Sequence, residues 1–114
     1  MRNLIGTATG IVLALAAMTA AAGSARAQQP GNAERGLSLA QKICSECHLV
    51  DKVAGRSTNP DAPTFETIAK TPGLTSAALT VALRTSHRTM PNIVIKEDDS
   101  RDIVAYILSL KNGD

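Results

Sequence analysis

The sequence is poor in aromatic residues, with one Phe (Phe65), one Tyr (Tyr106) and no Trp among its 114 residues. It has two cysteines, which excludes a scaffold held by several disulfides. The length suits one domain and excludes a repeat array or a polytopic membrane protein. Small domains bury a modest share of their surface, and aromatic side chains usually fill their cores. Something other than aromatic residues must therefore supply bulk here.

The N-terminal segment has the order of a secretory signal peptide. Arg2 precedes an apolar run, Gly10–Ala22, and small residues follow it up to Ala27. A retained membrane anchor is the alternative, but it would need roughly 20 apolar residues and this run is shorter. We therefore expect residues 1–27 to be a cleaved signal peptide. Residues 28–114 would then form one periplasmic domain without stable membrane insertion.

The basic balance of the chain comes from that same segment. Twelve Lys and Arg residues face ten Asp and Glu residues, which gives a formal net charge of +2. Arg2 and Arg26 both lie in the expected signal peptide, so the remaining domain is formally neutral. Its basic residues are scattered singly between acids. We expect no nucleic-acid partner, because no basic patch is visible.

Both cysteines lie in one short motif, Cys44-Ser45-Glu46-Cys47-His48. C-x-x-C-H is the attachment signal for c-type haem. Residues three apart share one face of a helix, so both sulfur atoms can reach the two vinyl groups along one porphyrin edge. The His after the second Cys then lies under the iron as the proximal ligand. The motif predicts one covalent haem c per chain, consistent with the export signal that precedes it.

Three other sites could use the same residues. A thioredoxin-like redox pair would need βαβ patterning, which the sequence does not show. A disulfide across two intervening residues would constrain the unfolded chain very little. A zinc site made of Cys44, Cys47, His48 and His87 has suitable ligand types, but adjacent Cys47 and His48 would have to face one tetrahedral ion. We favour haem attachment over these alternatives.

A haem iron has a second axial position, for which Met90 is the strongest candidate. Met1 and Met18 lie in the expected signal peptide, so Met90 is the one methionine of the remaining domain. A lone Met is usually core filler, but this one stands in a polar loop directly before Pro91. His87 is the rival ligand, flanked by two arginines at helical spacing that indicate a solvated face. Thioether ligation would raise the reduction potential relative to two histidines.

The rest of the domain reads as helices, and no convincing strand alternation is present. Apolar residues repeat at helical spacing before the motif (Gly36, Leu39, Ala40 and Ile43) and near the C-terminus (Ile103, Tyr106, Ile107 and Leu110). Residues that favour helix starts and helix ends therefore predict an all-α domain. Its expected helices run from Asn32 into the motif, from Thr64 to Lys70, from Thr75 to near Thr85, and from Glu97 or Ser100 to just before Gly113.

These residues give the chain a family resemblance: from about Ala33 to Lys111 it resembles a small bacterial class I cytochrome c. The resemblance implies about four short helices wrapped around one covalent haem. It matches Gly36 to the small residue eight positions before the first haem Cys, which packs against an aromatic of the last helix, here Tyr106. Ala40 departs from the pattern, because the family usually has a bulky residue there.

The resemblance also implies how the proximal ligand is held. In the family a proline carbonyl after the motif accepts the N–H of the proximal His and fixes its ring. Pro63 matches that residue best, with Pro60 second. The Met-Pro pair at Met90 and Pro91 also fits the family's ligand loop.

The function implied is one-electron transfer between a donor and an acceptor protein, without catalysis by the chain itself. We expect a monomeric periplasmic carrier with an exposed haem edge and His48 and Met90 as iron ligands. One alternative is a cytochrome subunit docked permanently on a periplasmic dehydrogenase or oxidase. Another is a haem peroxidase or gas sensor with a labile sixth ligand.

Overall fold

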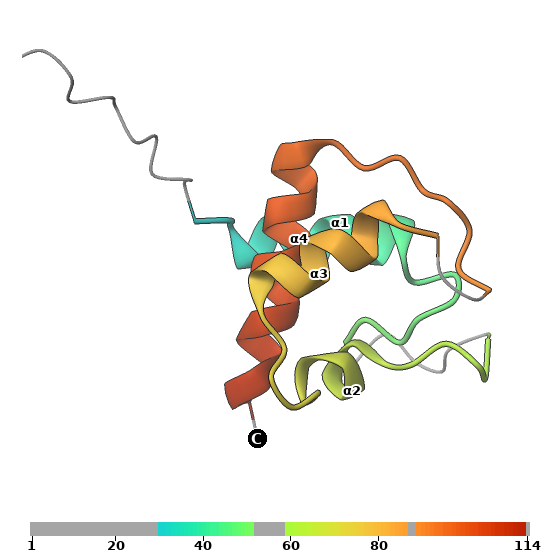
Figure 1. Cartoon of the computed structure of the whole chain (residues 1–114), viewed down its shortest axis with the longest axis horizontal. Helices are drawn as coiled ribbons and strands as arrows, with labels where there is room; N and C mark the ends of the chain where they lie inside the picture. The colour runs from blue at the N-terminus through green and yellow to red at the C-terminus, as the bar shows by residue number, and fades with distance from the viewer. Residues whose placement is uncertain (1–29, 52–58, 87–88, 114) are drawn as a thin grey trace, which may run out of the picture.

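The computed structural model describes residues 30–51, 59–86 and 89–113 of the chain (Figure 1). The residues expected to form the signal peptide lie outside these ranges. The described elements are α1 (Ala33–Ile43), α2 (Phe65–Ala69), α3 (Ser76–Arg84), α4 (Glu97–Ser109) and the short 3-10 helix η1 (Leu110–Asn112). No strand occurs among the described residues, so the expected all-α class is confirmed.

The first three helices begin at the caps that the sequence indicates. Asn32, Thr64 and Thr75 precede α1, α2 and α3, and each side-chain oxygen accepts a hydrogen bond from the backbone N–H three residues later, at 2.9 to 3.1 Å. Each cap satisfies one of the backbone donors that a helix leaves free in its first turn. The polar residue at each cap therefore sets where the helix starts.

Helix α4 begins at Glu97, which decides between the two starts that the sequence left open. Lys96 is the N-cap and makes no side-chain capping bond. Acidic residues occupy the first turn, where the helix dipole favours negative charge. Ser100 lies inside the helix, and its buried Oγ has no hydrogen-bond partner among the described residues. Gly113 follows η1 with a φ of −86°, an ordinary value for any residue.

Helix α4 lies at the centre of the packing. It contacts α1, α2 and α3, and Figure 1 shows it crossing α1 and α3. Gly36 and Ala40 are the buried residues of α1, and Ala40 is fully buried. Because both residues are small, the backbones of α1 and α4 approach closely. The alanine that departs from the family pattern therefore lies within the core.

A carboxylate of α4 joins the start of α1 to this core. The backbone N–H of Asn32 donates to Oδ1 of Asp102 at 2.7 Å, and Nε of Arg35 lies 3.3 Å from Oδ2 of the same residue. Arg35 also pairs with Asp99 at 2.8 Å. Asp102 is buried, so these partners compensate the loss of water around its charge.

The hydrophobic core is small and mostly aliphatic. Ile103 and Val50 are its largest fully buried side chains, and the two aromatic residues complete it from α2 and α4. This composition fits a domain that gains bulk from a bound group. Within the ranges that the structure describes, no helix combines the length and apolar content needed to cross a bilayer.

Candidate functional site

The C-x-x-C-H motif forms a continuous turn at the end of α1. The backbone N–H of Cys44 donates to Ala40 O at 2.8 Å, which closes the last helical bond. The N–H groups of Cys47 and His48 both donate to Cys44 O, at 3.1 and 2.9 Å. The motif thus keeps a helical geometry after the helix ends, and residues three apart in such a turn share a face.

Neither cysteine forms a disulfide, and the two thiols lie in different environments. Cys44 is buried and Cys47 is partly exposed. Burial raises the pKa of the Cys44 thiol to about 11, so this thiol is protonated at neutral pH. The two sulfur atoms are therefore not joined in a disulfide.

The imidazole of His48 is oriented by a backbone carbonyl. Its Nδ1 lies 2.7 Å from the carbonyl oxygen of Pro63. Because a carbonyl can only accept, Nδ1 carries a proton, and in the neutral ring Nε2 keeps its lone pair. This geometry is the arrangement found around metal-binding histidines, in which the second nitrogen donates to a carbonyl. Between the two prolines considered from the sequence, Pro63 is the one that makes this contact.

Aromatic rings lie beside the His48 ring. The ring of Phe65 is 5.6 Å from that of His48, and the ring of Tyr106 is 6.3 Å from that of Phe65, centroid to centroid. The Phe65 backbone N–H also donates to Leu49 O at 3.0 Å. The start of α2 therefore fixes both the His48 ring and the backbone directly after it.

The close approach expected at Gly36 is present. A Cβ atom added to Gly36 would lie 2.8 Å from Cβ of Tyr106 and 2.0 Å from the carbonyl oxygen of Asp102. No side chain larger than hydrogen fits there without a shift of α1 against α4. This contact fixes α1, and with it the position of Cys44 eight residues later.

The candidate sixth ligand lies in the connection between α3 and α4. Met90 is partly buried and makes a single-residue bridge. In the view of Figure 1, this connection and the turn after α1 both project to the same side of α4. The rival ligand, His87, lies outside the described residues.

The donor set of the motif fits a covalently bound haem. Two thiols stand three residues apart on one turn, and a histidine whose Nδ1 donates to a carbonyl follows them. Among the described residues, no group of three or more His, Cys, Asp and Glu side chains converges as a metal cluster would. The thiols and His48 are therefore not gathered around one point, as a zinc site would need. The spacing of three residues between the cysteines on a helical turn suits attachment along a porphyrin edge.

Sequence reasoning missed Phe65, which lies beside the His48 ring, and Asp102, which joins the start of α1 to α4. Phe65 was noted only as one of two aromatics, although its position two residues after Pro63 could have signalled its role. Asp102 was not among the candidate residues. Its partners Asn32 and Arg35 lie more than sixty residues earlier in the chain, and no local pattern reveals such a pairing.

The chain is similar to cytochrome c-552 from Bradyrhizobium diazoefficiens. The two are 33% identical over 102 residues, which cover 90% of this chain and 93% of that protein. No protein-family model matches the chain, and no solved structure matches it significantly. Because the similarity extends over nearly the whole of both chains, it is not confined to the C-x-x-C-H motif.

Proposed function

Because the chain belongs to the small class I c-type cytochromes, we propose that it is an exported one-electron carrier with His/Met ligation of a single haem. Membership of this family makes it a haem c electron-transfer protein, with redox partners, rather than an enzyme. The hydrogen bond between His48 and Pro63 carries the residue-level proposal, because it leaves Nε2 of His48 free to bind iron.

Cys44 and Cys47 would hold the haem covalently. Each thiol would add across one vinyl group of the haem, with its sulfur bonding to one carbon and its proton going to the other, so attachment would need no oxidant. The turn that carries both thiols supports this assignment. Since these are the only two cysteines of the chain, one haem is held per chain.

His48 and Met90 would be the axial ligands. The Pro63 carbonyl fixes the tautomer of His48 and increases the basicity of Nε2. Met90 is partly buried in the connection before α4, and its thioether would favour the reduced iron relative to a second histidine. With both axial positions closed, oxygen and peroxide are excluded from the iron, and the chain carries electrons without chemistry of its own.

The proposed carrier is exported and works as a periplasmic monomer. The signal peptide expected at residues 1–27 supports export and leaves residues 28–114 as the mature domain. Haem attachment to C-x-x-C-H motifs takes place outside the cytoplasm, which agrees with that route. Encounters between redox proteins use small interfaces, so donor and acceptor can share one surface in turn.

Spectra of the purified holoprotein with and without carbon monoxide test this function. We expect a low-spin haem c spectrum, with a thioether-to-iron band at the red end of the oxidised spectrum. The reduced protein should not change on addition of carbon monoxide at neutral pH. Rapid binding of carbon monoxide would overturn the carrier assignment and indicate a peroxidase or gas sensor. Co-purification in fixed ratio with a dehydrogenase would overturn the assignment of a free carrier.

A further inference from the structure

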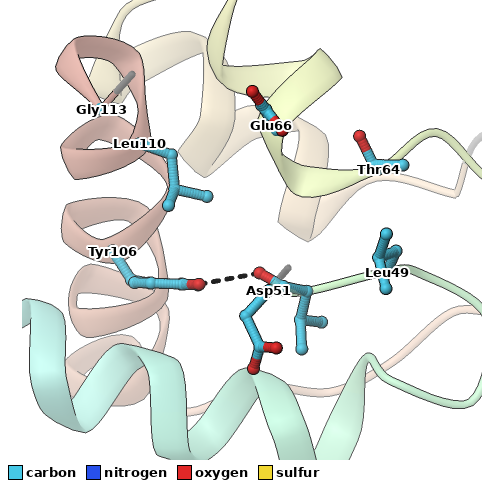
Figure 2. Close-up of a pocket in the computed structure, with 8 residues that line it drawn as sticks. Leu49, Asp51, Thr64, Glu66, Tyr106, Leu110 and Gly113 are labelled. Carbon is cyan, nitrogen blue, oxygen red and sulfur yellow. Dashed lines mark hydrogen bonds between the residues drawn. The ribbon is translucent and has the colours of Figure 1, made fainter. Parts of the chain in front are cut away.

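The hydroxyl of Tyr106 makes a hydrogen bond to the backbone just after His48. It donates to the carbonyl oxygen of Val50 at 2.8 Å, across 56 positions of sequence. Figure 2 shows this bond as a dashed line between α4 and the extended segment beside Asp51. Val50 is 1% exposed and Tyr106 is 7% exposed, so the bond is buried. Buried hydrogen bonds hold their partners more firmly than exposed ones.

Tyr106 therefore contacts both sides of the C-x-x-C-H motif. Its Cβ lies against Gly36, which fixes α1 before Cys44, and its hydroxyl holds Val50, two residues after His48. One side chain of α4 thus sets the position of the polypeptide on entering and on leaving the motif. The packing contact uses the base of the side chain, and the hydrogen bond uses its tip.

We propose that the Tyr106 hydroxyl is a positioning group for the proximal iron ligand, acting through Val50 on the hydrogen bond between His48 and Pro63. This inference rests on the proposed function, in which His48 binds the haem iron. The bond at Val50 stops the backbone of residues 48–50 from moving away from α4. The His48 ring is thereby kept within 2.7 Å of the Pro63 carbonyl.

The surroundings of the bond allow water to replace the hydroxyl. A cleft of about 270 Å³ is lined by Val50 and Tyr106, with Leu49 and Leu110 at its apolar walls (Figure 2). Without the hydroxyl, water from this cleft would bond to the Val50 carbonyl. Water satisfies the carbonyl but does not tie it to α4, so the segment stays folded and becomes more mobile.

The hydroxyl is a proton donor throughout the neutral range. Burial raises the pKa of Tyr106, and the negative charge of Asp51 raises it further. The neutral phenol is the form that can donate to a carbonyl. The positioning bond is therefore present under the conditions in which a carrier works.

Tyr106→Phe tests the inference because it keeps the ring and the contact with Gly36 and removes the hydroxyl. The exchange of the His48 Nδ1 proton with solvent, measured by NMR in the reduced holoprotein, should become about tenfold faster, as expected for loss of one hydrogen bond. The reduction potential should rise, because a weaker bond to Pro63 makes the His48 ring a poorer donor to oxidised iron.

Ser109→Ala is the matched control. The Ser109 hydroxyl donates to the backbone carbonyl of Tyr106 at 2.6 Å, so this variant removes one hydrogen bond from the same turn of α4 without touching Val50. Exchange of the His48 proton and the reduction potential should stay at their wild-type values. Equal changes in both variants would overturn the inference, because general loosening of α4 would then explain them.

A second substitution acts in the opposite direction. Tyr106 is the single tyrosine of the chain, so biosynthetic 3-fluorotyrosine labels it alone. Its hydroxyl is a stronger donor, and at mildly acidic pH, where it is neutral, exchange of the His48 proton should slow. Unchanged exchange in both Tyr106 variants, with haem covalently bound, would overturn this inference alone. A wild-type protein without covalent haem would overturn the proposed function as well.

Discussion

Gly36 of α1 lies directly against the carbonyl of Asp102 in α4. A Cβ atom at residue 36 would be 2.0 Å from the carbonyl oxygen, far inside any real contact distance. The carbonyl belongs to the α4 backbone and the place of a Cβ is fixed by the α1 backbone, so no side-chain rotation could relieve the overlap. The crossing of the first and last helices therefore depends on the absence of a side chain at one position.

Gly36→Ala should lower the free energy of unfolding of the holoprotein by about 2–3 kcal/mol, because overpacking outweighs the gain in helix propensity. Thermal and denaturant unfolding, followed by circular dichroism, give this value. Gly113→Ala is the control, since its nearest atom would be 3.9 Å away and its stability should stay within about 0.5 kcal/mol of wild type. Equal stabilities of the two variants would contradict the close crossing.

Asp102→Ala should cost about 2–3 kcal/mol of stability, because it leaves the Asn32 N–H and the Arg35 guanidinium without their buried partner. Asp98 lies in the same helix, is largely exposed and pairs with Arg101 on the surface. Asp98→Ala should therefore cost at most about 1 kcal/mol. If denaturant unfolding gave the same loss for both, Asp102 would be one more surface carboxylate.

Met90→Ala should leave the haem attached but open the iron. The red absorption band of the oxidised protein should disappear, carbon monoxide should bind the reduced form, and the reduction potential should fall, since axial ligand choice spans about 0.8 V in haem proteins. Spectra and redox titration measure these effects. His87→Ala should keep the wild-type spectrum; the reverse pattern would assign the sixth ligand to His87.

Cys44→Ala/Cys47→Ala should yield a haem-free chain that does not fold. The core of the described residues has Ile103 and Val50 as its largest fully buried side chains, which leaves little burial to offset chain entropy. Far-ultraviolet circular dichroism should show loss of helix. Ser45→Ala, between the two cysteines, should retain haem and helicity. Native helix content in the haem-free double variant would refute this dependence.

Alkaline pH should destabilise the wild-type protein more than Tyr106→Phe. The pKa of Tyr106 is raised in the folded state by burial and by Asp51, so the folded protein holds this proton more tightly than the unfolded chain. The stabilisation is complete below the unfolded pKa of about 10 and is lost as pH rises through the folded pKa. Unfolding at several pH values should show the two stabilities converging; parallel curves would contradict the raised pKa.

Local signals in the sequence predicted most of the fold. Asn32, Thr64 and Thr75 cap the first three helices because a side-chain oxygen at such a position bonds a backbone N–H three residues away. The start of α4 could not be predicted this way. Ser100 has the chemistry of a cap, but the acidic turn before it extends the helix and buries its hydroxyl.

In the candidate site, too, the features set by local sequence could be predicted and the long-range contacts could not. The spacing of Cys44, Cys47 and His48 is local and was evident in the sequence, and the family resemblance supplied Gly36 and Pro63. The bond from Tyr106 to Val50 joins residues 56 positions apart. Its existence depends on where α4 crosses the chain, which periodicity does not specify. The assignment of Met90 stays a prediction, because its rival His87 lies outside the described residues.

The intact mass of the purified protein tests the central claim most directly, after expression in a host that exports and matures c-type cytochromes. Covalent attachment at Cys44 and Cys47 predicts a denatured mass equal to residues 28–114 plus one haem. A mass equal to the polypeptide alone, with haem lost on denaturation, would contradict the account.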